Sequence, residues 1–245
     1  MSAALRGRLE AGEQLVGGIV RMPCEDLVDM IGVAGLDFVV IDCEHGPPDV
    51  VPLRQHIAFA EAHGVGVLVR TGEREDGLVL RALDQGAQGI VVPHVDDAEQ
   101  ARQVVASAHY PPRGRRGFAT YPRAGGFGTA DAEAHRSRMS AETLVIVMIE
   151  SPRGVRNAEE ILAVDGVDGY LVGVADLGAS SGPGDPSVAE SLAAVAAAAE
   201  RQGKIRADIV GTPQAGVAAH DDGAQLVVHN IAAAVMSTLQ GLRIP

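Results

Sequence analysis

Eight short apolar runs recur along this chain, and longer segments with helical spacing separate them. The runs cover 15–20, 38–42, 65–70, 89–92, 144–149, 169–172, 205–210 and 226–229. Most of them are continuously apolar, which is typical of strands that are covered on both faces of a parallel sheet. The helical segments cover 23–34, 48–62, 74–85, 96–108, 152–163, 187–202, 212–222 and 231–242. Eight such units predict one α/β domain over 1–245, a closed (β/α)8 TIM barrel.

An open, doubly wound sheet is the alternative architecture. It would normally carry a glycine-rich phosphate-binding turn after the first strand, and VRMPCED at 20–26 is not such a turn. The barrel pattern is interrupted once, by an expected long loop at about 109–143. The loop carries Arg113, Arg115, Arg116 and Arg123. These arginines suggest either a lid that faces an anion or a segment between subunits.

Composition and charge indicate what the protein is expected to bind and in which compartment it is expected to lie. The formal net charge of -12 argues against nucleic acid, because phosphate binding needs a basic surface. No charged-then-apolar leader opens the chain, and no apolar run approaches the roughly 18 residues of a membrane span. The two cysteines, Cys24 and Cys43, offer no disulfide framework and indicate a reducing compartment. We therefore expect a cytoplasmic protein that does not bind membranes.

Ionisable residues follow five of the strands, at the carboxyl ends where barrel enzymes carry their active sites. They are Asp42, Glu44 and His45 after the second strand, Arg70 after the third, His94 after the fourth, Glu150 after the fifth and Asp176 after the sixth. Each has an ordinary structural alternative: an acid can cap the next helix, and Arg70 can pair with Glu73 at the surface. Their convergence on one mouth of one barrel favours an active site.

The residue types indicate the chemistry. Glu150 and Asp176, without a cysteine or paired histidine nearby, suit a hard divalent cation such as Mg²⁺ or Mn²⁺. His45 beside Asp42 is typical of a general base whose tautomer the acid fixes. Arg70 can hold an oxyanion or a carboxylate. Together these groups predict proton abstraction or carbon–carbon cleavage beside a carbonyl, through an enolate.

Longer motifs carry a family resemblance along most of the chain. They are FVVIDCEHGP (38–47), VLVR (67–70), ALDQGAQGIVVPHVDDAEQA (82–101), YPPRGRRGFA (110–119) and MIESPRGVRNAEEILAVDGVDGYLVGVADLGASSG (148–182). In combination they resemble the class II, metal-dependent pyruvate aldolases of the HpcH/HpaI family.

The resemblance implies a role for each matching residue. Glu150 and Asp176 would bind Mg²⁺, Mn²⁺ or Co²⁺, Arg70 would stabilise the enolate, and His45, oriented by Asp42, would transfer protons. The pyruvate carboxylate would lie against the segment that contains Gly173, Val174, Ala175 and Ser180. Asp84 matches a position that helps to organise the histidine of a neighbouring subunit, since the family forms trimers of dimers. A homo-oligomer, a hexamer, is therefore expected.

Three departures from the family pattern lie close to these residues. Met148 stands where many members carry Gln, Val174 follows Gly173 where proline is usual, and His229 and Asn230 stand where the last strand normally ends in Gly-x-Asp. They leave the metal pair and the base unchanged, and they leave the natural substrate open.

Three functions remain to be compared. The leading hypothesis is an aldolase or retro-aldolase that acts on 4-hydroxy-2-oxo acids and forms pyruvate, or a related 2-oxo acid, and an aldehyde. The second is a lyase of the related malyl- or citramalyl-CoA thioester branch, and the third is a barrel that binds a 2-oxo acid without turnover. A Schiff-base aldolase is not expected, because Lys204 is the only lysine and precedes the seventh strand, at the far end of the barrel.

Overall fold

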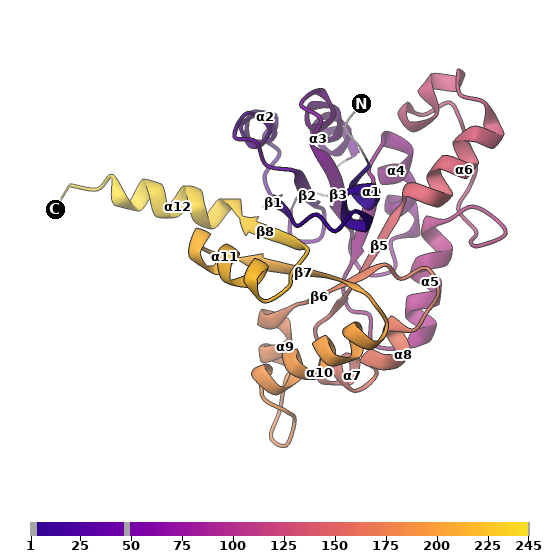
Figure 1. Ribbon diagram of the computed structural model, residues 1–245. Helices are drawn as coiled ribbons and strands as arrows, with labels where there is room; N and C mark the ends of the chain where they lie inside the picture. Colours follow the sequence, from indigo (N-terminus) through magenta and orange to yellow (C-terminus); the bar gives the residue numbers. More distant parts are fainter. Residues whose placement is uncertain (1–3, 47–49, 245) are drawn as a thin grey trace.

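The computed structural model describes residues 4–46 and 50–244 of the chain. Eight parallel strands close into a barrel in the order of the sequence, with β8 paired to β1 (Figure 1). The strands are β1 (Leu15–Val20), β2 (Phe38–Asp42), β3 (Gly66–Arg70), β4 (Gly89–Val92), β5 (Leu144–Ile149), β6 (Gly169–Val172), β7 (Ile205–Val210) and β8 (Leu226–Asn230). The predicted TIM barrel is therefore confirmed, and each strand boundary lies within one residue of its prediction.

Helices follow the strands on the outside of the barrel. Those expected from the sequence are α2 (Glu25–Val33), α3 (Val50–Ala62), α4 (Asp76–Gln85), α5 (Ala98–Ala108), α7 (Pro152–Arg156), α8 (Ala158–Leu162), α10 (Val188–Arg201), α11 (Pro213–Asp221) and α12 (Ile231–Gly241). The helix predicted over 152–163 is divided at Asn157 into α7 and α8. The helix predicted over 48–62 is α3, and residues 48 and 49 lie outside the described part of the chain.

The strand side chains form two hydrophobic layers, one inside the barrel and one between the barrel and the helices. Alternate strand residues, among them Phe38, Val40 and Leu68, fill the inside of the barrel, and Leu5 and Leu9 of the extra helix α1 (Leu5–Glu10) belong to the same cluster. The intervening residues, such as Val39 and Ile41, pack outward in a second cluster with residues of the surrounding helices. Because strand side chains alternate between the two faces, the inward positions continue as polar residues where the strands end. We call this carboxyl-terminal end of the barrel the mouth.

The segment 109–143 differs from the expected loop, because its last third is helical. It contains a short 3-10 helix, η1 (Arg123–Gly128), and the helix α6 (Ala132–Glu142). The side chain of Asp131 caps α6 by accepting hydrogen bonds from the main-chain N–H groups of Glu133 and Ala134. Only His135 and Met139 of α6 are buried, so the helix lacks the apolar stripe by which sequence patterns reveal helices.

Four arginines of this segment were expected to face an anion or a second subunit. Each forms an ion pair with a carboxylate of the same chain: Arg113 with Asp165, Arg115 with Asp76, Arg116 with Asp84, and Arg123 with Glu61. These contacts do not test the anion-facing lid, so the lid and the role between subunits both stay predictions.

Two further features bear on earlier expectations. The ammonium of Lys204 donates a hydrogen bond to the carbonyl oxygen of Val167 at 2.7 Å, and both residues precede their strands. Lys204 is thus at the amino end of the barrel, as predicted.

Within 4–46 and 50–244, no helix has both the length and the apolar character that crossing a membrane requires.

Candidate active site

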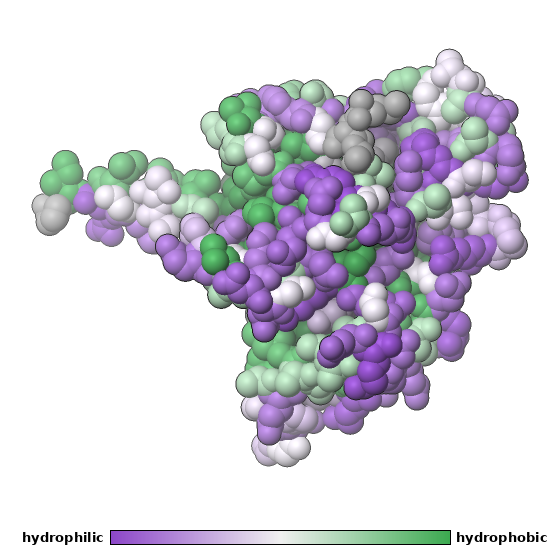
Figure 2. Space-filling view, in the orientation of Figure 1, coloured by the Kyte–Doolittle hydropathy of each residue, from purple (hydrophilic) through white to green (hydrophobic). Residues whose placement is uncertain are grey.

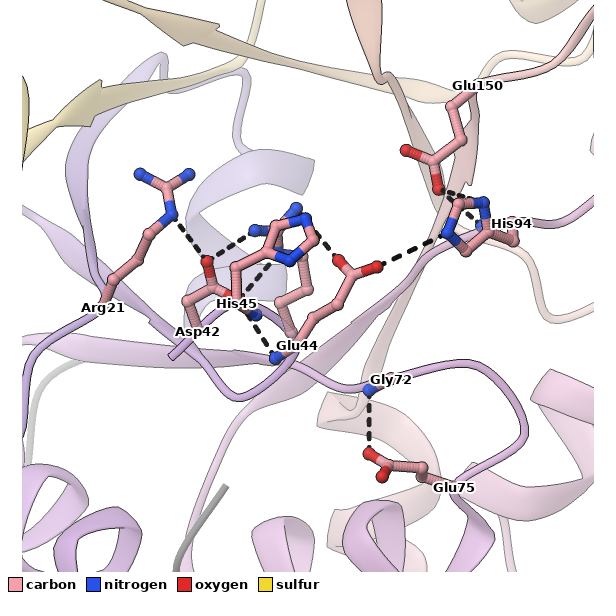
Figure 3. A network of polar contacts seen from close by, with 9 residues as sticks. Arg21, Asp42, Glu44, His45, Gly72, Glu75, His94 and Glu150 are labelled. Atoms are coloured by element: carbon pink, nitrogen blue, oxygen red, sulfur yellow. Dashed lines mark hydrogen bonds and ion pairs between the residues drawn. The ribbon is translucent and has the colours of Figure 1, made fainter. Parts of the chain in front are cut away.

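A buried ion pair between β2 and β3 forms one wall of the mouth; Figure 3 shows its carboxylate, Asp42, with Arg21 and Glu44. Arg70, the last residue of β3, binds the carboxylate of Asp42 through Nε at 2.9 Å and Nη2 at 2.5 Å. Its Nη1 lies 3.1 Å from Oε2 of Glu44. The register pairs Asp42 with Arg70 directly across the two strands, which is why the side chains meet. The alternative in which Arg70 pairs with Glu73 at the surface is therefore wrong, and Glu73 pairs with Arg74 instead.

A second arginine, Arg21, reaches the same carboxylate from the residue after β1. Its Nε donates to Oδ2 of Asp42 at 2.8 Å, and its Nη1 donates to Oδ1 of Asn230 at 3.2 Å. We did not predict Arg21 from the sequence. The signal that could have found it is the inward period of β1, because Ile19 lies inside the barrel and Arg21 is the next residue in that phase.

Asp42 does not orient the imidazole of His45, contrary to expectation. Its carboxylate accepts hydrogen bonds from Arg21, from Arg70 and from the main-chain N–H groups of Glu44 and His45. Burial alone would raise the pKa of Asp42, but these hydrogen bonds and charges outweigh it and hold the pKa below its usual value. Asp42 therefore fixes Arg70 and the backbone of the turn, and the side chain of His45 is left exposed at the rim.

Across the mouth, Glu150 follows β5 and is buried. Its Oε1 accepts a hydrogen bond from the main-chain N–H of His94 at 2.6 Å and lies 3.2 Å from Nδ1 of the same residue. The imidazole Nε2 of His94 is 3.5 Å from Oε1 of Glu44, so His94 joins the two carboxylates (Figure 3). Burial raises the pKa of Glu150, and the charges of Glu44 and Asp176 raise it further against the opposing effect of His94.

The segment after β6 lies against Glu150. A Cβ built on Gly173 would come within 2.2 Å of Oε2 of Glu150, so only glycine leaves room for the carboxylate in this position. Asp176 is exposed in the first turn of α9 (Val174–Ser180). The hydroxyl of Ser180 donates to the main-chain carbonyl of Glu150 at 3.3 Å. Ser180 is the last residue of α9.

The remaining predicted residues around the mouth differ in exposure and in the direction of their side chains. Val174 and Ala175 begin α9 and are exposed, whereas Met148 is buried inside the barrel below Glu150. The ring of His229 lies against Gly216 of α11, which turns it away from the mouth, whereas Asn230 bonds Arg21 there.

Asp84 is not part of this cluster in the single chain. It lies on α4, where its carboxylate accepts a hydrogen bond from Nη2 of Arg116 at 2.6 Å. Its predicted role concerns a neighbouring subunit and stays a prediction.

The donor set fits a hard divalent cation with few protein ligands. Glu150 and Asp176 are close enough for the charge of one to raise the pKa of the other. In the described part of the chain, no three or more His, Cys, Asp or Glu side chains gather in a metal-binding arrangement. Two carboxylate ligands would leave several octahedral positions for water and substrate, which is the usual way in which Mg²⁺ is held.

Comparisons with known proteins identify the family of the chain. The profile of the HpcH/HpaI aldolase/citrate lyase family matches residues 23–237. The chain is 39% identical over 175 residues to a hydroxypyruvate/pyruvate aldolase of Roseobacter denitrificans, which covers 71% of this chain and 68% of that one. It is 31% identical over 243 residues to a hydroxypyruvate/pyruvate aldolase of Sagittula stellata, with 95% and 93% covered. The crystal structure of an HpcH/HpaI aldolase from Desulfitobacterium hafniense superimposes with a TM-score of 0.88 at 30% identity, over 99% of this chain and 98% of that one.

The barrel, its polar mouth and these relatives define the class: the protein is a carbon–carbon lyase of the aldolase type. The chain belongs to the HpcH/HpaI aldolase/citrate lyase family.

Proposed function

We propose that the protein is a divalent-metal-dependent aldolase and retro-aldolase that acts on 4-hydroxy-2-oxo acids and forms pyruvate, or a related 2-oxo acid, and an aldehyde. The observation that supports this proposal is that Glu150 and Asp176 follow the neighbouring strands β5 and β6, whereas Arg70 ends β3 at the same end of the barrel. The names of the relatives from Roseobacter denitrificans and Sagittula stellata support the same chemistry.

Glu150 and Asp176 are the residues that would hold the metal ion. Bound there, a divalent cation would polarise the carbonyl group of the 2-oxo acid and stabilise the negative charge of its enolate. The burial of Glu150, its hydrogen bond from His94 and its contact with Gly173 fix one ligand before any ion binds. A ligand that is already positioned costs little reorganisation when the substrate reacts.

Arg70 is the residue that faces the developing oxyanion. Two hydrogen bonds to Asp42 and the ion pair with Glu44 hold its guanidinium rigidly at the end of β3. A fixed cation stabilises negative charge more effectively than a mobile one, because it does not have to reorient during the reaction. Asp42 therefore acts on the reaction through Arg70, as a positioning residue.

His45 is the proposed general base. During cleavage its imidazole would take the proton of the 4-hydroxyl group while the bond between C3 and C4 breaks, and during addition it would return that proton. Its side chain is exposed at the rim, where it could reach the 4-hydroxyl end of a substrate whose 2-oxo acid end lies at Glu150 and Asp176. An imidazole can both accept and donate a proton, which proton transfer in both directions requires.

We also infer that the protein is a homo-oligomer, with the hexamer as the expected state. The helix α12 extends away from the barrel and has no buried residue (Figure 1). Apolar residues lie exposed along it, including Val235, Met236 and Leu239 (Figure 2). A second copy that covers this helix would remove the apolar surface from water. The proposed cytoplasmic location is consistent with the free thiols of Cys24 and Cys43.

The experiment that tests the proposed activity is a screen of aldehydes with pyruvate in the presence of Mg²⁺, Mn²⁺ or Co²⁺, read by mass spectrometry. We expect products with the mass of pyruvate plus the aldehyde, and none after treatment with EDTA. Cleavage of malyl-CoA or citramalyl-CoA, with no product in the aldehyde screen, would overturn the proposal in favour of the thioester branch of the family.

A further inference from the structure

A cavity of about 180 Å³ lies outside the barrel, between the helices α4 and α5 and the ends of β3 and β4 (Figure 1). Its apolar wall includes Val79, Val92 and Val95, which belong to the outward-packing cluster and not to the inside of the barrel. Of the described residues that form the proposed active site, only His94 lines this cavity. The cavity is therefore separate from the mouth and contacts it through one residue.

The size of the cavity limits what it can hold. In another protein, an apolar cavity of about 150 Å³ is sufficient to bind benzene. A cavity of about 180 Å³ therefore accommodates a molecule built on one six-membered ring, with room for a small substituent. Pro93 and Val104 add further apolar surface against which such a ring would pack.

The hydroxyl of Thr71 supplies a polar group at the cavity. Thr71 follows Arg70, whose side chain points into the mouth, so the alternation along the strand directs Thr71 outwards to the cavity that it lines. Thr71 is 0% exposed, and its Oγ1 has no hydrogen-bond partner within 4–46 and 50–244. A buried hydroxyl without a partner costs free energy that a bound hydrogen-bonding group would recover.

The charged residues around the cavity do not favour an ion. They are paired with one another or with the backbone: Arg74 with Glu73 at 3.2 Å, Arg115 with Asp76 at 2.7 Å, and Glu75 with the main-chain N–H of Gly72 at 2.8 Å. A charged ligand would have to break one of these pairs to be neutralised. A neutral ligand is therefore favoured.

His94 connects the cavity with Glu150. Its main-chain N–H donates to Oε1 of Glu150 at 2.6 Å, and its imidazole Nδ1 lies 3.2 Å from the same oxygen (Figure 3). The backbone of His94 has a φ of 54°, in the left-handed region that a residue other than glycine adopts at a cost. Pro93 and Val95 on either side of it also line the cavity. A molecule packed against these three residues would hold the turn and, with it, the N–H that orients Glu150.

From these features we propose that the cavity is an effector site. It binds a neutral molecule built on one ring, with a hydroxyl or similar group that bonds Oγ1 of Thr71. Its occupancy raises the affinity of Glu150 and Asp176 for a divalent ion. The binding of the ring requires no metal, whereas the coupling rests on the proposed metal site. By linkage, the metal ion raises the affinity for the ring by the same factor.

Phenol and benzene test the binding on the intact, EDTA-treated protein, because they differ by one hydroxyl group. Titrations followed by saturation-transfer NMR should give a dissociation constant for phenol on the order of 1 mM, the range that so small a ligand can reach. Absence of phenol binding would overturn the site. Benzoate is similar in size but charged, and binding of benzoate as tight as that of phenol would overturn the assignment of a neutral ligand.

Three substitutions locate the bound ring, and thermal melting checks that each variant is folded. Thr71→Val removes the hydroxyl and should weaken phenol binding about 2- to 10-fold, the range for one neutral hydrogen bond, without weakening benzene binding. Val104→Phe should block both ligands, because its ring would fill the cavity. Arg102→Phe is the matched control, since it places the same ring on α5 outside the cavity lining. Phenol binding that Thr71→Val and Val104→Phe leave unchanged would overturn the site.

Isothermal titration with Mn²⁺, with and without saturating phenol, tests the coupling. We expect phenol to raise Mn²⁺ affinity about 5-fold or more in the wild type and in Arg102→Phe, the lower end of typical allosteric couplings, and to have no effect in Val104→Phe. Equal Mn²⁺ affinity with and without bound phenol in the wild type would overturn the effector role. Absence of Mn²⁺ binding by the wild type would instead contradict the proposed metal site, and the phenol titrations would still decide the ring site.

Discussion

Gly173→Ala should damage the proposed metal site without removing a ligand. The added Cβ would lie 2.2 Å from Oε2 and 2.7 Å from Cβ of Glu150, which is 1.2 Å and 0.7 Å inside the ordinary contact distance of 3.4 Å. The backbone of Gly173, at φ -77° and ψ 81°, lies outside the left-handed region that favours glycine, so the effect would come from the clash with Glu150. The carboxylate would have to rotate away from His94, since the backbone of Glu150 is fixed at the end of β5.

The magnitude follows from what the displaced carboxylate loses. Disturbing the groups that orient a metal ligand typically costs 10- to 100-fold in metal affinity, and we expect about that loss for Mn²⁺. Overpacking of a buried site should also lower the free energy of unfolding by about 1–3 kcal/mol. Isothermal titration calorimetry with Mn²⁺ and denaturant unfolding of the metal-free protein measure the two effects separately.

Gly178→Ala is the matched control, in the helix α9 that Gly173 precedes. The nearest atom to a Cβ there is a side-chain atom of Val188 at 4.0 Å, so the methyl group has room. Alanine in a helix should raise the free energy of unfolding by about 0.5–1 kcal/mol and leave Mn²⁺ affinity unchanged. If Gly173→Ala bound Mn²⁺ as tightly as Gly178→Ala, the assignment of Glu150 as a ligand in its observed orientation would be refuted.

The remaining predictions concern single residues. His45→Ala should keep its bound divalent ion, as measured by elemental analysis, but lose about 10²–10⁴-fold in aldol turnover; a rate near wild type would return His45 to a structural role. Because the folded pKa of Asp42 is depressed, its ion pairs contribute stability at neutral pH that is lost as the pH falls from about 4 through the folded pKa. Asp42→Asn should therefore flatten the acid limb of the unfolding free energy, and an unchanged limb would contradict that. Borohydride with pyruvate should leave the enzyme active, and covalent trapping on Lys204 would overturn the metal mechanism.

The barrel could be predicted from the sequence because its strands are short, continuously apolar runs, which indicate strands buried on both faces. Runs such as LVIVMI at β5 are buried on both faces, so neither the strand nor its end depends on distant contacts. The helix α6 escaped prediction for the opposite reason. Its sequence has few apolar residues, and the signal that starts it is the cap by Asp131.

The site was predicted as a set of residues but not as a set of contacts. The positions of Asp42, Arg70 and Glu150 follow from where strands end, which the sequence reveals. The pairing of Asp42 with Arg70 depends on the register of β2 and β3. The hydrogen bond from Arg21 to Asn230 depends on closure of the barrel, because it joins the ends of β1 and β8, which are far apart in the sequence. Both properties belong to the three-dimensional fold, which is why Asp42 was assigned to His45 instead.

The central claim is that Glu150 holds a divalent ion that makes the enolate of a 2-oxo acid accessible. Exchange of the methyl protons of pyruvate with deuterated solvent, followed by proton NMR, tests this directly, because it reports enolate formation without an aldehyde. We predict rapid exchange with Mg²⁺, Mn²⁺ or Co²⁺, none after EDTA, recovery when metal is returned, and no recovery in Glu150→Ala. Full exchange by the chelated enzyme, or by Glu150→Ala at ordinary metal concentrations, would contradict the account.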